Sequence, residues 1–89
     1  MKLSSNFSLS ELIKSQTAER HGISNMPTDE HIENLKLLCE NVLQPVRDQF
    51  GPVMISSGYR SENLSEKIGS SRKSQHCRGQ AADFECHGH

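Results

Sequence analysis

Apolar residues recur at helical intervals through the middle of the chain. They stand three or four positions apart, at Ile32, Leu35, Leu38, Val42 and Val46. This spacing places them on one face of a helix, so we expect that face to be buried. Thr28 precedes the acidic pair Asp29 and Glu30, a pattern typical of a helix N-terminus. Pro45 lacks a backbone donor and therefore predicts a kink or break at residues 41–44.

Polar residues near the start of the chain predict two shorter helices. Ser8 and Glu11 have the spacing of a capping box, and Phe7 and Leu12 stand where a hydrophobic staple would close. A helix should therefore begin directly after Ser8. A further helical turn is expected over residues 17–20, because a glycine follows shortly after it.

After the long helix the pattern changes to short extended runs. Residues 52–57 and 80–86 are interpreted as two strands, the second from a weaker signal. A capped helix over residues 62–68 and a basic, serine-rich loop over residues 69–74 are expected between them. The order of elements predicts an α+β fold, with N-terminal helices packed on a small, mainly antiparallel sheet. We expect a single domain over residues 1–89.

Composition narrows the classes of function. The formal net charge of -1 argues against a general nucleic-acid binder. No apolar run is long enough to span a bilayer, so we expect no membrane partner. The N-terminus lacks the apolar stretch of a secretory signal, and the product is therefore expected to be cytoplasmic as synthesised.

Charge is nevertheless distributed unevenly. Between residues 51 and 80, Glu62 and Glu66 are outnumbered by basic residues, namely Arg60, Lys67, Arg72, Lys73 and Arg78. This locally cationic stretch favours an anionic ligand group, such as the terminal carboxylate of a peptide. The alternative is a solvated loop whose basic side chains serve solubility.

The three cysteines do not indicate a disulfide framework. Cys39, Cys77 and Cys86 form no Cys-x-x-Cys pair, and their number is odd. We expect reduced thiols that behave as small buried hydrophobes. Cys77 directly follows His76, but neighbours in an extended segment point to opposite sides, so these two residues are not expected to share a metal.

The most chemically informative run extends from Ser74 to Asp83. It places an imidazole, His76, and a carboxylate, Asp83, seven positions apart. Zinc binds imidazole nitrogen and carboxylate oxygen, and a catalytic zinc site typically uses three protein ligands and a water. Bringing both side chains to one metal requires a tight reversal between them, which Gly79 permits. Two of three metal ligands are thus visible in the sequence.

The pattern Ser-x-His-x-x-Gly-x-Ala-x-Asp over residues 74–83 and Ser-Gly-Tyr-Arg-Ser over residues 57–61 resemble the M15 family of zinc peptidases. Residues 7–12 and 33–47 also look like the N-terminal half of that family. The resemblance implies a fold like that of D-alanyl-D-alanine peptidases and the hedgehog domain. It implies a Zn²⁺ cofactor and peptidoglycan stem peptides as substrates, cleaved by a carboxypeptidase or an endopeptidase. Family members are often encoded by phages.

The resemblance also implies roles for residues around the metal. Arg60 would help bind the substrate or stabilise the oxyanion formed at the attacked carbonyl, as a fixed guanidinium can do; its alternative role is an ion pair with a nearby glutamate. Ser74 would hold the His76 loop or orient the ligand. Tyr59 is assigned to packing rather than chemistry.

Two features of the family pattern have no counterpart in this sequence. The resemblance implies a third zinc-binding histidine and an acidic general base tens of residues after Asp83, and the sequence continues for six residues beyond Asp83. We therefore expect an M15-like domain truncated at its C-terminus, with impaired activity. In a continuing strand, His87 would lie about 13 Å from Asp83, at roughly 3.3 Å per residue. Neither His87 nor His89 is therefore favoured as the missing ligand.

Two alternatives remain open at this point. The chain could be a non-catalytic phage structural or interaction protein that keeps the fold, or a hydrolase completed by its terminal histidines. An unpaired strand at residues 80–86 would also favour homo-oligomers, because exposed edges pair with other chains.

Overall fold

The structure, a computed structural model, describes residues 1–86 and has an α+β fold. In chain order its elements are β1 (Lys2–Ser4), β2 (Phe7–Ser8), α1 (Leu9–Ile13), α2 (Gln16–His21), α3 (Asp29–Leu38), η1 (Cys39–Leu43), α4 (Gln44–Phe50), β3 (Val53–Ser57), α5 (Glu62–Lys67), η2 (Gln75–Arg78) and β4 (Asp83–Cys86). Here η1 is a π-helical turn and η2 a 3₁₀ turn.

The chain begins with a short hairpin that the sequence analysis did not predict. β1 and β2 pair antiparallel and lead directly into α1. The capping box that starts α1 is confirmed, because Ser8 Oγ accepts from Glu11 N at 3.4 Å while the Glu11 carboxylate accepts from Ser8 N at 3.2 Å. Phe7 and Leu12 are both buried, as expected of a hydrophobic staple.

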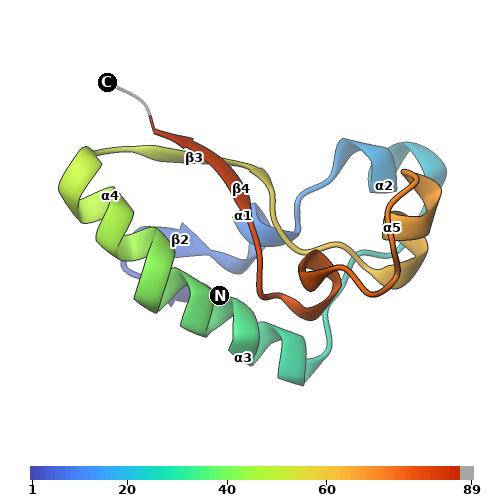
Figure 1. Ribbon diagram of the computed structural model, residues 1–89, viewed down its shortest axis with the longest axis horizontal. Coiled ribbons are helices and arrows are strands. Elements are labelled where there is room, and N and C mark those ends of the chain that lie inside the picture. The colour runs from blue at the N-terminus through green and yellow to red at the C-terminus, as the bar shows by residue number, and fades with distance from the viewer. Residues whose placement is uncertain (87–89) are drawn as a thin grey trace.

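A single long helical run forms one side of the molecule (Figure 1). Thr28 caps it as predicted, its Oγ1 accepting from His31 N at 3.2 Å. The helix does not break where a kink or break was expected from Pro45; it contains there the π turn η1, in which Gln44 N donates to Cys39 O. Because proline has no amide hydrogen, it cannot make the usual bond to the carbonyl four residues earlier. The wider turn accommodates this loss, and the helix continues to Gly51.

The π turn changes which residues face the core. Cys39 and Leu43 are buried, whereas Val42 is 45% exposed. The prediction that Val42 belongs to the buried stripe is therefore wrong. Regular helical spacing would bring Val42 back to the core, but a π turn holds more residues and delays this return by about one position.

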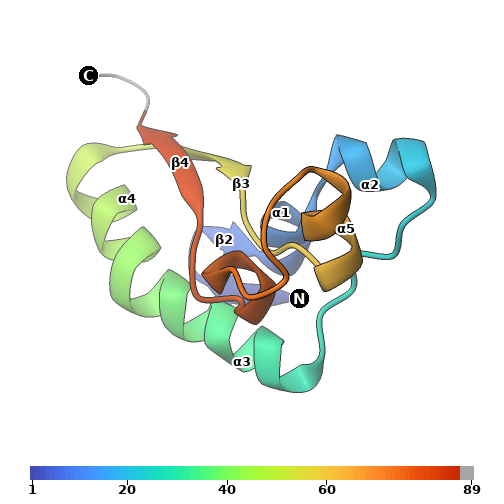
Figure 2. The ribbon, with the colours of Figure 1, turned by 45° about the vertical axis from the view of Figure 1, so that its right-hand side comes forward.

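β3 and β4 form a two-stranded antiparallel sheet beside the long helix (Figure 2). The two strands and the helix pack around buried residues from four segments of the chain, namely Leu3, Phe7, Leu12, Leu35, Cys39, Leu43 and Tyr59. β4 begins at Asp83, so the strand predicted from Gln80 is three residues too long. Gln80 N instead donates to Gln75 O and closes the turn before the strand.

Within residues 1–86, no strand pairs with the outer edge of β4. The association through residues 80–86 that the sequence suggests stays a prediction. None of the helices in the described part of the chain is both long and apolar enough to cross a membrane.

The π turn can be tested with two neighbouring substitutions. Leu43→Ala should lower the free energy of unfolding by about 2 to 5 kcal/mol, because it leaves a cavity in the core. Val42→Ala should cost less than about 1 kcal/mol, because that side chain is half exposed. Urea denaturation followed by circular dichroism measures both values. The reverse order would mean that a regular helix continues through residues 39–43.

Candidate metal centre and adjoining groove

His76 lies in the 3₁₀ turn η2 rather than in the extended segment that the sequence analysis assumed. Ser74 begins the turn, its Oγ accepting from His76 N at 3.2 Å, so this serine does hold the His76 loop. Gly79 ends it with φ +74°. A Cβ on Gly79 would lie 2.6 Å from His31 O, so glycine is required both for the backbone angle and for the close approach to α3.

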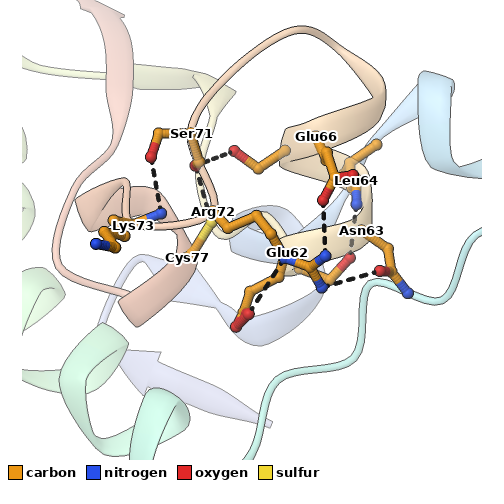
Figure 3. A network of polar contacts seen from close by, with 10 residues as sticks. Glu62, Asn63, Leu64, Glu66, Ser71, Arg72, Lys73 and Cys77 are labelled. Carbon is orange, nitrogen blue, oxygen red and sulfur yellow. Dashed lines mark hydrogen bonds and ion pairs between the residues drawn. The ribbon is translucent and has the colours of Figure 1, made fainter.

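The loop before η2 is tied to α5 by a polar network (Figure 3). Arg72 contacts Glu66 at 2.7 Å and Glu62 at 3.5 Å. Ser71 O accepts from the buried Ser65 Oγ at 2.8 Å and from Cys77 Sγ at 3.8 Å. The exposed ion pairs each contribute little to stability, but the buried serine fixes the backbone that leads to His76.

Two hydrogen bonds join the His76 turn to the segment after β3. His76 Nδ1 lies 2.8 Å from Gly58 O, and Arg60 N donates to His76 O at 3.1 Å. Gly58 is itself pressed against α1, because a Cβ there would overlap Leu12 O. The motif glycine is therefore needed for close backbone approach, in keeping with the bend expected there.

The structure brings His76 and Asp83 together. His76 Nε2 lies 3.7 Å from Asp83 Oδ2, and the two side chains are 13% and 69% exposed. The register between β3 and β4 shifts between Ile55 and Ser57, so a bulge lies directly opposite Asp83. Ser56 Oγ donates to Asp83 O at 3.0 Å and so links the two strands at the bulge. Bulges commonly redirect a side chain in this way.

The facing atoms of His76 and Asp83 are suited to bind a cation. Gly58 O can only accept, so His76 Nδ1 carries the hydrogen of that bond, and Nε2 faces Asp83 with a lone pair whenever it carries no proton. Two lone-pair atoms face each other at a separation too long for a hydrogen bond. Tetrahedral zinc with bonds of about 2.0–2.1 Å places neighbouring ligand atoms roughly 3.3 Å apart. A proton on Nε2 or a metal ion would each satisfy the arrangement.

Arg60 has no ion-pair partner among residues 1–86, which contradicts the alternative that it pairs with a nearby glutamate. Its Nε is buried without a hydrogen bond in the described part of the chain. Glu62 and Glu66 are both engaged by Arg72 instead, so the excess of basic residues expected for residues 51–80 remains with Arg60, Lys67, Lys73 and Arg78.

Asn25 is a structural residue that the sequence analysis missed. Its Nδ2 donates to Ile13 O at 2.7 Å and to Tyr59 O at 3.0 Å, while its Oδ1 accepts from Ser61 N at 2.7 Å. Asn25 therefore fixes the backbone on both sides of Arg60. An asparagine in an irregular loop gives no signal of such long-range contacts.

Arg60 also lines a groove of about 510 Å³ between the α1–α2 connection and β3. The groove is bordered by Lys14, Ser15, Gln16, Thr17, Met54, Ile55, Ser56, Ser57, Gly58, Tyr59, Arg60, Leu64 and Ile68. Gly58 belongs both to this lining and to the support of His76, whereas neither His76 nor Asp83 lines the groove.

Tyr59 is a core residue, 5% exposed, and its hydroxyl lies 3.2 Å from His31 Nδ1. Burial, with smaller contributions from Cys77 and Glu62, raises the pKa of Tyr59 and keeps its hydroxyl protonated. The sequence analysis assigned Tyr59 to packing, and its buried position in the core agrees with that assignment.

Within residues 1–86, no cysteine belongs to a group of side chains arranged to hold a metal. All three thiols are free, and burial, followed by Glu11 and Glu40, raises the pKa of Cys39 to about 11. Within residues 1–86, no group of three or more His, Cys, Asp or Glu side chains is arranged to hold a metal. His87 and His89 lie outside the described residues. The described part of the chain therefore contributes the pair of His76 and Asp83.

A family model described as Peptidase M15 matches residues 5–89. The chain belongs to the M15 peptidase family. M15 peptidases are metallopeptidases and are generally zinc-dependent. No curated protein and no solved structure matches the chain.

The steric role of Gly79 can be separated from its backbone angle. Gly22→Ala should cost about 1 to 2 kcal/mol, because Gly22 has φ +63° but open space around its Cβ position. Gly79→Ala should cost a further 1 to 3 kcal/mol or so, because the added methyl meets His31 O. Thermal and urea denaturation provide the comparison. Equal losses would show that η2 does not depend on close contact with α3.

Proposed function

We propose that this chain is a zinc-dependent, M15-type peptidase domain acting on peptidoglycan stem peptides, with impaired activity in the 89-residue polypeptide. The observation that carries the proposal is the pair formed by His76 Nε2 and Asp83 Oδ2, 3.7 Å apart and with the histidine tautomer set by Gly58 O. Membership of a metallopeptidase family supports zinc as the cation.

His76 and Asp83 would hold the metal through Nε2 and Oδ2. Zinc, when bound, supplies a Lewis acid that polarises a peptide carbonyl. Gly58 O orients the imidazole and increases its basicity, the usual role of an outer partner of a ligand histidine. The high exposure of Asp83 leaves this side of the pair open to substrate.

Arg60 would act on the substrate. Its backbone is fixed by His76 on one side and by Asn25 through the flanking residues. Its guanidinium pairs with no carboxylate of residues 1–86 and is therefore free to donate to a substrate oxygen. Preorganised donors of this kind lower the energy of a developing oxyanion.

The described residues supply two metal ligands, whereas a catalytic zinc typically has three. This favours weak metal binding and low activity in the 89-residue polypeptide. A non-catalytic interaction protein that retains the M15 fold is the second candidate, and the same two-ligand count supports it.

Metal binding provides the first test of the proposal. The wild-type chain should bind zinc weakly by isothermal titration calorimetry, and His76→Ala should weaken that binding by about tenfold or more. Asp83→Asn should also weaken it, because a neutral amide replaces the carboxylate. His21→Ala is the matched control, since His21 is exposed and lies on α2. Equal affinities of wild type and His76→Ala would refute the proposed ligand role.

Activity provides the second test. The purified polypeptide should cleave stem peptides about 10² to 10⁴ times more slowly than a complete zinc peptidase, the range that a general base typically contributes. Release of D-alanine and cleavage of cross-linked peptides are measured by liquid chromatography with added zinc. Efficient turnover would contradict the expected impairment and would direct attention to the residues after Asp83.

A further inference from the structure

The peptide group between Tyr59 and Arg60 is held at both of its ends. Its carbonyl, Tyr59 O, accepts from Asn25 Nδ2 at 3.0 Å, and its amide, Arg60 N, donates to His76 O at 3.1 Å. Because a peptide group is rigid and planar, a side chain that fixes its oxygen also fixes the direction of its N–H. Hydrogen bonds connected in this way also strengthen one another. Asn25 and His76 are therefore linked through one peptide group.

The carboxamide of Asn25 is in turn anchored to two other segments. Its Nδ2 also donates to Ile13 O at 2.7 Å, and its Oδ1 accepts from Ser61 N at 2.7 Å. Ile13 is the last residue of α1, so its carbonyl has no partner inside that helix. A carboxamide has two hydrogens to donate, and Asn25 uses both. Rotation of this side chain would break several hydrogen bonds at once, so it connects the end of α1 rigidly to the segment after β3.

The segment that Asn25 holds also determines which nitrogen of the His76 ring carries the proton. Gly58 O accepts from Nδ1 at 2.8 Å, and Gly58 directly precedes the peptide group that Asn25 fixes. On the other side of the ring, Asp83 Oδ2 lies 3.7 Å from Nε2 and would attract a proton there. Two acceptors therefore compete for the single proton of the neutral ring. Gly58 O prevails as long as residues 58–60 keep their position.

We infer that Asn25 is a positioning residue for the metal ligand proposed at His76. The inference rests on the proposed function for the role of His76, and it extends the site to the loop between α2 and α3. Asn25 holds the peptide group whose N–H binds His76 O, and the imidazole then stays within reach of Gly58 O. The lone pair of Nε2 is thereby kept available for a cation.

The tautomer of His76 in the metal-free protein tests this inference. The ¹⁵N-labelled chain is studied by long-range ¹H–¹⁵N correlation NMR at a pH of about 8, where an imidazole is ordinarily neutral. In the wild type, the proton should lie mainly on Nδ1. In Asn25→Ala, the ratio of the Nε2–H form to the Nδ1–H form should rise by about threefold or more, because the hydrogen bond to Gly58 O is weakened. An unchanged ratio, or a wild-type ring protonated mainly on Nε2, would overturn the inference.

Gln44→Ala is the matched control for loss of a multiply bonded carboxamide. The Gln44 side chain bonds to Ser4, Asn6 and Asp48, and none of these residues belongs to the candidate site. Its removal should lower the free energy of unfolding, measured by urea denaturation, without changing the His76 tautomer ratio. A rise equal to that in Asn25→Ala would mean that loss of stability alone moves the proton, which contradicts a positioning role.

Asn25→Asp separates the bonds of the side chain. It is also the variant of closest shape, so it decides the question if Asn25→Ala does not fold. An ionised carboxylate still accepts from Ser61 N but cannot donate to Tyr59 O or Ile13 O. The Nε2–H form should therefore increase as in Asn25→Ala. A wild-type ratio in Asn25→Asp would show that the bond to Tyr59 O is dispensable, and the inference would then be wrong.

Zinc affinity gives an independent measurement. By calorimetry, Asn25→Ala should weaken zinc binding by about threefold to tenfold, less than the loss of His76 itself, because Asn25 acts through the ligand rather than on the metal. Where the wild type binds zinc, equal affinity in Asn25→Ala would contradict the positioning role. If the wild type binds no zinc, the proposed function fails, whereas the tautomer ratio of the metal-free protein still decides the inference.

Discussion

Two hydrogen bonds between the His76 turn and the segment after β3 organise the whole candidate site. One runs from His76 Nδ1 to Gly58 O and the other from Arg60 N to His76 O. The first sets the imidazole tautomer and turns Nε2 toward Asp83. The second fixes the backbone of the one arginine of this segment. A single junction between two distant parts of the chain therefore places both the proposed metal ligand and the proposed substrate-binding residue.

Close backbone contacts with the helices keep this junction in place. Gly58 lies against Leu12 O at the end of α1, and Gly79 lies against His31 O on α3. At both positions a side chain would collide with a carbonyl oxygen, which cannot move without disturbing a helix. The glycines of the two motifs, Gly58 and Gly79, are thus needed for steric reasons. Both parts of the candidate site pack against the helices α1 and α3.

Two arginines of the chain differ in how their charge is balanced. Arg72 is satisfied by two glutamates of α5 and helps to hold the loop before η2. Arg60 shares a groove with Lys14, and no carboxylate belongs to that lining. The charge of Arg72 is balanced by carboxylates of the chain, whereas Arg60 forms no ion pair within residues 1–86.

The sequence by itself determined the local structure and the chemistry of the motif. Ser8 and Thr28 act as helix caps, Gly79 turns the chain, and His76 lies close to Asp83, because each of these features depends on neighbouring residues or on a short loop. Tertiary structure decided the rest. Val42 is exposed because a π turn accommodates Pro45, and His76 lies in a 3₁₀ turn that Ser74 caps and Gly79 ends against α3. The three hydrogen bonds of Asn25 and the burial of Arg60 Nε without a hydrogen bond in the described residues depend on contacts between segments far apart in sequence. No local sequence pattern predicts such contacts.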